Sequence, residues 1–246
     1  MNNFTTFANR DVSDLVFCEY KTKKPFLNCT WANTTATELT GETVYAYGGK
    51  GRPKRVAFTG DSGGTLKIET QLQTMQMYSL MLGSDIDTKA SWMKREVLTA
   101  AEDSVTLSEV PLAGTVFVFE ANDDCGKSLT ISADTSSKKV TGANITNGKQ
   151  FIVYYQTEKN TGVQKISVKS TTFPKAFIVY GDTWDKAEDD SIISQKMIAY
   201  KCQPQKQVSF SWANSGDPAT ITITCDLLAD DQDRMLDLIT YEEDSE

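Results

Sequence analysis

Apolar and polar residues alternate in two stretches between residues 54 and 69. Val56 and Phe58 stand among Arg55, Ala57 and Thr59, and further along Leu66 and Ile68 alternate with Lys67 and Glu69. A period of two is typical of half-buried antiparallel strands. The segment 60–64 between the stretches reads Gly-Asp-Ser-Gly-Gly, which supplies turn residues. The pattern therefore predicts a hairpin over residues 54–69.

The period changes directly after this hairpin. Leu72, Met75, Ser79 and Leu82 fall on one face of a helix, and Gly83 is placed to end it. The sequence therefore predicts one short amphipathic helix over residues 71–82.

Beyond residue 83 the chain is a series of short apolar runs separated by turn residues. The runs 115–121 and 176–180 are apolar on both faces, as central strands are. Together the pattern predicts an all-β fold, a β-sandwich or barrel with one flanking helix. The further predicted strands are 95–99, 104–107, 127–132, 150–156, 163–169, 196–201, 207–212 and 220–227.

The two ends of the chain differ in character from its middle. Residues 1–42 are rich in Asn and Thr and are predicted to form an extended N-terminal arm, with a strand of the main domain as the equal alternative. Residues 43–228 are predicted to form a single β domain. Residues 229–246 form an acidic C-terminal segment, in which Asp230 is placed to cap a second helix.

The net charge is −8 and is concentrated in that segment. Residues 229–246 hold eight acidic residues and Arg234, a net charge of −7, so the other 228 residues are nearly neutral. Tight binding to nucleic acid requires clustered positive charge. The nearly neutral body and the acidic segment of this chain therefore argue against such binding. No apolar run approaches the length of a membrane span, and the N-terminus lacks a secretory pattern, so we expect synthesis in a cytoplasm and no membrane partner.

The motifs that suggest catalysis or metal binding are each better explained by structure. The Gly-Asp-Ser-Gly-Gly segment matches the nucleophile motif of trypsin-like proteases, but the chain has no histidine to act as general base. Paired carboxylates at 123–124, 188–190 and 230–231 lie in predicted turns, and the five cysteines, predicted to be buried free thiols, form no CxxC pair. The sequence thus predicts no enzyme, no cofactor and no metal site.

The order of several segments resembles the major tail tube proteins of contractile-tailed bacteriophages. These segments are GKGRPKRVAFTGDSGGTLKIETQ, a helix ending in Leu-Gly, VTLSEVPLAG, QFIVYYQ, TFPKAFIVYGDTW and SGDPATITITCDLLADDQDRMLDL. The resemblance extends from about Thr43 to Leu238 and implies a virion protein of the tail. Six copies would form a ring, and stacked rings would form a tube through which genomic DNA passes without specific binding. Tail sheath and baseplate or terminator proteins are the implied further partners.

Two other functions stay open at this stage. A capsid decoration or receptor-binding β-sandwich module would also be an all-β protein without catalytic motifs, and a hydrolase would need two buried carboxylates in one cleft.

The predicted interface between copies combines the hairpin, the helix and the two charged segments. The basic segment 48–55 is predicted to dock on an acidic surface, and the alternative is a solvated turn. The acidic segment is predicted to contact the basic segment of the next copy. Its alternative role is to keep single copies soluble. The interface residues are Lys50, Arg52, Lys54, Arg55, Val56, Phe58, Leu66, Ile68, Leu72, Met75, Asp230, Asp231 and Asp233.

Overall fold

A computed structural model describes residues 6–210, 212 and 214–241, and divides the chain into two compact units. The main unit comprises Met1–Asp85 and Ile166–Glu246, and the inserted unit comprises Ile86–Lys165. The predicted boundaries at 42/43 and 228/229 do not coincide with these units, since residue 42 lies inside a strand. Residues 43–228, predicted to form a single β domain, include parts of both units, and each unit has its own core.

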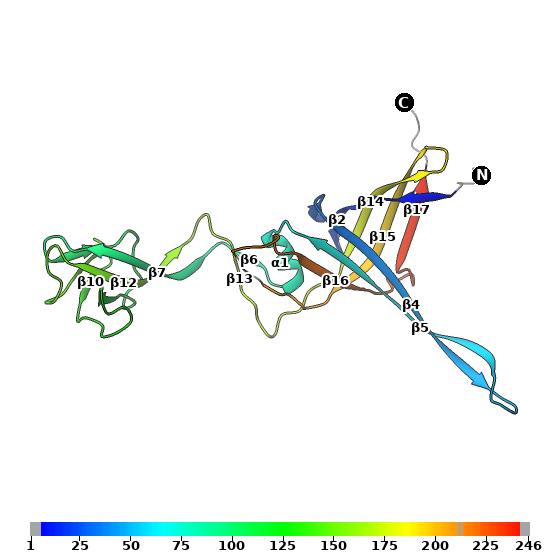
Figure 1. Ribbon diagram of the computed structural model, residues 1–246, viewed down its shortest axis with the longest axis horizontal. Coiled ribbons are helices and arrows are strands. Elements are labelled where there is room, and N and C mark those ends of the chain that lie inside the picture. Colours follow the sequence, from blue (N-terminus) through cyan, green and yellow to red (C-terminus); the bar gives the residue numbers. More distant parts are fainter. Residues whose placement is uncertain (1–5, 211, 213, 242–246) are drawn as a thin grey trace. The chain divides into compact units, whose positions relative to one another are not determined.

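The main unit is built on a nine-stranded antiparallel sheet, which confirms the all-β prediction (Figure 1). Its strand order is β3-β2-β14-β15-β16-β5-β4, with β1 added to β14 and β17 added to β15. The strands are β1 Phe7–Asn9, β2 Asp14–Glu19, β3 Pro25–Cys29, β4 Thr34–Tyr47, β5 Lys54–Thr70, β14 Phe177–Ala187, β15 Ile192–Pro204, β16 Ile221–Leu227 and β17 Leu236–Tyr241.

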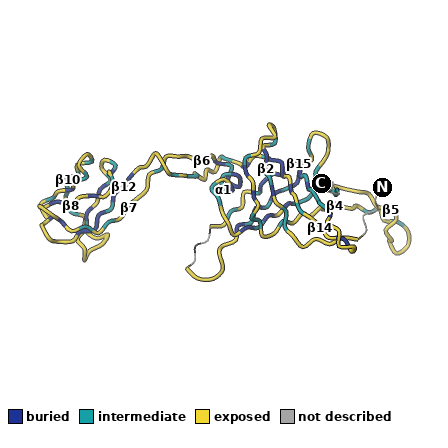
Figure 2. Tube along the Cα trace, turned by 90° about the horizontal axis from the view of Figure 1, so that it is seen from above, coloured by how far each residue is buried: buried dark blue, intermediate teal, exposed yellow. Residues whose placement is uncertain are grey.

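The sheet encloses one apolar core because β15 pairs with different strands along its length. Residues 194–199 of β15 pair with β17, and residues 202–204 pair with β16. Thr37 of β4 donates to the Met197 sulfur of β15 at 3.5 Å, so strands from distant parts of the sheet order meet. Figure 2 shows the buried residues concentrated where these strands overlap. The core includes Leu15, Phe17, Leu66, Ile68, Phe177, Val179, Ile221 and Ile223.

The predicted helix is present as α1, Met75–Leu82. The Thr74 hydroxyl accepts a hydrogen bond from the Met77 N–H at 3.2 Å and caps the first turn. Gly83 ends the helix in the left-handed region, with φ 68° and its N–H bonded to the Ser79 carbonyl, as its position predicted. Leu72 precedes the helix and is exposed, so the buried face is formed by Met77, Leu80, Met81 and Leu82.

The predicted turn at residues 60–64 is wrong. β5 runs through this segment without reversing, and the hairpin turn lies at residues 48–53, between β4 and β5. Gly63 and Gly64 pair with Thr40 and Leu39, and a side chain at Gly64 would lie 2.8 Å from both the Glu38 carbonyl oxygen and a Leu39 methyl group. Gly64 therefore permits a close approach of the two strands, whereas a side chain at Gly63 would make only an ordinary contact.

Both ends of the chain also differ from the prediction. The expected C-terminal helix after Asp230 is replaced by β17, whose main chain pairs with residues 194–199 of β15. Residues 14–29 form β2 and β3 within the main sheet, and Leu15, Phe17 and Leu27 lie in its core. The N-terminal segment therefore follows the alternative of strands in the main domain. Residues 242–246 of the acidic segment lie outside the described residues.

The inserted unit consists of two small antiparallel sheets around a core that includes Val118, Phe151, Val153 and Tyr155. One sheet has the order β7-β12-β9 and the other β10-β11-β8. The predicted strand 115–121 is β9 at a sheet edge, whereas 176–180 lies in β14, which has neighbours on both sides. The elements are β6 Ile86–Asp87, β7 Ala90–Thr99, β8 Ser104–Thr106, β9 Phe117–Glu120, β10 Ser132–Asp134, β11 Lys139–Thr141, β12 Gln150–Lys159 and β13 Lys165–Ile166.

Candidate subunit interface

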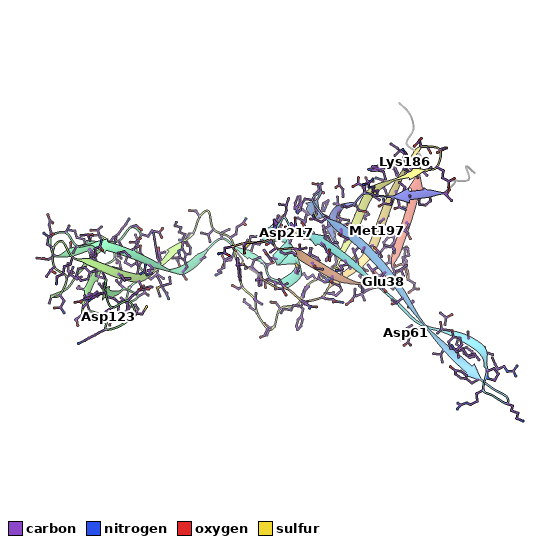
Figure 3. The ribbon with its side chains drawn as sticks, in the orientation of Figure 1. Glu38, Asp61, Asp123, Lys186, Met197 and Asp217 are labelled. Atoms are coloured by element: carbon purple, nitrogen blue, oxygen red, sulfur yellow. The ribbon has the colours of Figure 1, made fainter. Side chains whose placement is uncertain are left out.

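The β4–β5 hairpin extends beyond the sheet from which it starts. β5 pairs with β16 only over residues 65–70, so residues 39–64 form a two-stranded ribbon with no third strand among the described residues. We call this ribbon the arm. Figure 1 shows it projecting from the main unit, Figure 2 shows it as exposed, and Figure 3 places Glu38 near its base and Asp61 farther along it.

The end of the arm is a tight, basic turn. Gly49 and Gly51 both have φ 87°, a conformation that favours glycine. The Gly48 N–H bonds to the Pro53 carbonyl at 3.3 Å, and Arg55 Nε donates to the Gly48 carbonyl at 3.2 Å. These bonds fix the turn while exposing Lys50 and other cationic residues to solvent. We call residues 48–55 the basic tip; its charged members are Lys50, Arg52, Lys54 and Arg55.

One face of the arm carries exposed apolar side chains. Val44 lies opposite Phe58, and Ala46 lies opposite Val56, which places all four on the same face. Val44, Val56 and Phe58 are 57%, 50% and 56% exposed. We call these four residues the apolar strip. Clustered apolar side chains at the surface mark sites of association, so this strip is the chain's clearest candidate contact.

The opposite face of the arm is held by a cation–π contact. Lys54 Nζ lies 3.7 Å from the centre of the Tyr45 ring, and Tyr45 is the cross-strand partner of Ala57. This contact directs Lys54 to the face away from the apolar strip, while Arg55 is directed to the turn through its bond to Gly48. The two faces of the arm thus differ in chemistry.

The sequence-predicted interface residues are divided between surface and core. Lys50, Arg52, Val56 and Phe58 lie together on the arm and are exposed. Leu66 and Ile68 are fully buried in the core of the main unit, so the expectation that they contact a second copy is withdrawn: their apolar surface is already used within the chain. Leu72 is exposed before α1, and Met75 is half-buried at its start.

The acidic candidates form a compact turn before β17. Asp230 accepts hydrogen bonds from the Gln232 and Arg234 N–H groups, both at 2.9 Å, and from the Arg234 guanidinium at 2.7 Å and 3.1 Å. Arg234 thereby lowers the pKa of Asp230 to about 2. Asp231 and Asp233 are exposed beside it. We call residues 230–233 the acidic turn; Asp230 is bonded within it, and its outward carboxylates are Asp231 and Asp233.

A groove of about 700 Å³ opens on the main unit between the β2–β3 turn, α1 and the start of β14. Its walls include Tyr20, Phe26, Leu80 and Phe177, and Gln76 and Ser79 of α1 line it as well. This groove was not predicted, because its three walls are separated by about 50 and 100 residues of chain. The apolar spacing in each segment predicted burial and gave no sign that the three would leave a space between them.

The residues whose pattern resembled catalytic or metal-binding motifs are distributed over several elements. Ser62 lies in β5 opposite Gly41. Within the described part of the chain, no group of three His, Cys, Asp or Glu residues is arranged to hold a metal ion. Cys18, Cys29, Cys202 and Cys225 are buried as predicted, and burial raises the pKa of the Cys202 thiol to about 12. Cys125 is exposed, which corrects the prediction for that residue.

Membrane insertion by a helix finds no support here. None of the helices in the described residues has the length and apolar character to cross a membrane.

Comparison with known proteins gives one family. The model of the YomU/Tube protein family matches residues 9–240, which is nearly the whole chain and covers both compact units. A search of curated proteins finds no match.

Proposed function

This chain belongs to the YomU/Tube protein family, a family of structural phage tube proteins, and from that premise we propose that it is the repeating subunit of a phage tail tube. We propose further that six copies form a ring and that rings stack into the channel for genome delivery. The protein would then be a component of the virion tail that acts by assembly and not by catalysis.

The observation that carries this proposal is the arm. An isolated two-stranded ribbon is at best marginally stable in water, and this one exposes an apolar strip along one face. Burial of Val44, Val56 and Phe58 against a second copy would supply the missing contact, at roughly 25 cal/mol per Å² of apolar surface removed from water.

Charge supports a channel for DNA. Outside the acidic C-terminal segment the chain is nearly neutral, so a wall built from it would release few counterions from DNA. Genomic DNA would then pass without specific binding. Tail sheath and baseplate or terminator proteins are the further partners that this proposed function implies.

Electron microscopy of the purified protein tests the proposal. We expect negative-stain images to show rings with sixfold rotational averages and tubes of constant diameter, increasing with protein concentration. Sedimentation velocity on the same samples should show large species in place of single subunits. Monomers or trimers that persist at high concentration would contradict the tube and favour a capsid decoration or receptor-binding module.

A further inference from the structure

The groove of the main unit is lined largely by apolar side chains, of which Phe26 is half-buried, while Leu80 and Phe177 are buried at its base. Phe26 and Phe177 meet edge to face on its wall, with ring centres 6.5 Å apart, and Leu80 of α1 contributes a third apolar side chain. Its volume of about 700 Å³ is within the range of sites that bind ligands or side chains of a partner. Such a space fits an apolar segment of another chain.

The acidic turn borders this groove. Tyr20 lines the groove, and its ring lies 5.4 Å from Lys201 Nζ. The Leu228 N–H bonds to the Lys201 carbonyl at 2.9 Å, so the chain enters the acidic turn beside this wall. In agreement with this position, burial and the carboxylates of Asp231 and Asp230 raise the pKa of the Tyr20 hydroxyl. The lining itself carries Glu19 and Asp85 beside Lys21 and Lys175, so the acidic character comes from the turn next to the groove.

The arm carries an apolar region followed by a basic one, which can match the apolar groove followed by the acidic turn. The apolar strip occupies its middle, and the basic tip follows directly at its end. An arm laid along the groove would set Phe58 and Val56 against the apolar floor, with Lys50 and Arg52 beyond them near the acidic turn. Apolar contact would supply affinity, and the opposite charges would select the direction of docking.

The arm and the groove lie at different ends of the main unit. In Figures 1 and 2, α1 stands at one end of this unit, and the arm leaves from the other end. The exposure of the apolar strip shows that the arm does not fold back on its own groove. Two complementary surfaces at opposite ends of one unit produce head-to-tail contacts, which close into a ring or continue as a filament.

We propose that the groove between α1 and the β2–β3 turn of one copy receives the apolar strip of a second copy's arm, with that arm's basic tip against the acidic turn. This inference rests on the proposed function, since it names the docking site used in self-assembly. The occupant is the arm and not a small molecule, because the arm combines an apolar face with adjacent cations in the required order.

Disulfide cross-linking between copies tests this contact. Cys125→Ser removes the exposed cysteine and provides the parent protein, in which the other four thiols are buried. One variant of this parent carries Val56→Cys on the arm, and the other carries Gln76→Cys on the exposed face of α1 in the groove. Mixing the two variants before assembly ensures that any bond between positions 56 and 76 joins different copies.

We expect oxidation of the mixed assemblies to give a covalent dimer on non-reducing gels, several-fold more abundant than in either variant alone. The matched control replaces Gln76→Cys by Ser215→Cys, an exposed position that does not line the groove. Equal linking of the control pair, or no link between 56 and 76 in assembled tubes, would overturn the arm–groove contact.

Microscopy of the same samples separates the two proposals. Tubes without the 56–76 link would overturn the docking site and leave the tube function standing. A Cys125→Ser parent that forms neither rings nor tubes would overturn both proposals. Tubes that contain the link support both.

Discussion

The two halves of β5 share a pattern of alternating apolar and polar residues, but the apolar side chains of one half are buried and those of the other are exposed. In residues 65–70 the alternating apolar side chains, Leu66 and Ile68, are fully buried under α1 and the neighbouring strands. In the outer half, Val56 and Phe58 follow the same period and are half exposed. The difference shows that alternation specifies a strand with one apolar face, whereas the neighbour that covers this face is specified elsewhere in the chain or in another copy.

The comparison separates stability from assembly. The inner half contributes to the fold of a single copy, since its side chains are packed within the main unit. The outer half contributes little to that fold, since its apolar strip contacts solvent. Substitutions in the two halves should therefore fail in different ways, although they change the same kind of residue in the same strand.

The largest effect should follow from Leu66→Asp. A carboxylate in this fully buried position has no partner, and the cost should be about 4 kcal/mol or more of unfolding free energy. We expect loss of the cooperative thermal transition measured by circular dichroism. The control Lys67→Gln changes the next residue, which is exposed, and should shift the unfolding free energy by less than about 1 kcal/mol. A stable Leu66→Asp protein would contradict the statement that the inner half of β5 stabilises the fold of a single copy.

Phe58→Asp should leave the fold intact and abolish assembly. The side chain is exposed in a single copy, so the unfolding free energy should change by no more than about 0.5 kcal/mol. The apolar contact proposed between copies would meet a charge, and sedimentation and microscopy should show no large species. Thr59→Asp adds the same charge on the other face of the arm and should retain assembly. Normal tubes from Phe58→Asp would remove the arm from the interface.

A smaller effect should mark the boundary between the two halves. Gly64→Ala places a methyl group 2.8 Å from the Glu38 carbonyl oxygen, so the strands must separate at the base of the arm. We expect a loss of about 1–3 kcal/mol, measured by urea unfolding. Gly41→Ala lies on the facing strand in open space and is the matched control. Equal stability of the two variants would show that this close approach carries no energetic weight.

The smallest effect concerns pH and the acidic turn. The pKa of Asp230 is lowered to about 2 by Arg234, so its charged form is favoured by folding. Its contribution is present above the ordinary value of 3.8 and is lost as the pH falls through about 2. Asp230→Asn should therefore lower the thermal midpoint at pH 7, and the difference should disappear between about pH 4 and pH 2. Asp217→Asn, in an exposed loop, controls for the loss of one carboxylate.

The elements that were predicted correctly are those whose structure is determined by neighbouring residues in the sequence. Gly83 ends α1 because a left-handed residue is required there, and the alternation at 220–227 became β16, as the sequence indicated. The turn at 60–64 was predicted wrongly because glycine and aspartate suit reversals, while here the facing strand needs glycine for room. A helix was predicted where β17 lies because Asp230 suits a helix N-cap and Met235, Leu238 and Ile239 share a helical face, whereas pairing with β15 makes the segment a strand.

The candidate site was predictable only in part. The basic tip and Phe58 stood out from the sequence, because charge and apolar alternation are visible in one segment. Leu66 and Ile68 carry the same signal and are buried, so exposure could not be predicted from the pattern alone. The groove and its contact with the acidic turn depend on Tyr20, Leu80, Phe177 and Asp231, which only the folded chain brings together.

The pairing of β6 with β13 gives the inserted unit a particular evolutionary freedom. The chain leaves the main unit at residue 86 and comes back at residue 165 through two strands that are hydrogen-bonded to each other, so the two ends of the insertion are about 5 Å apart. Any other module whose termini are adjacent fits the same junction without changing the sheet that would build the tube. The length and sequence of the chain between these two strands can therefore change while the junction itself stays the same.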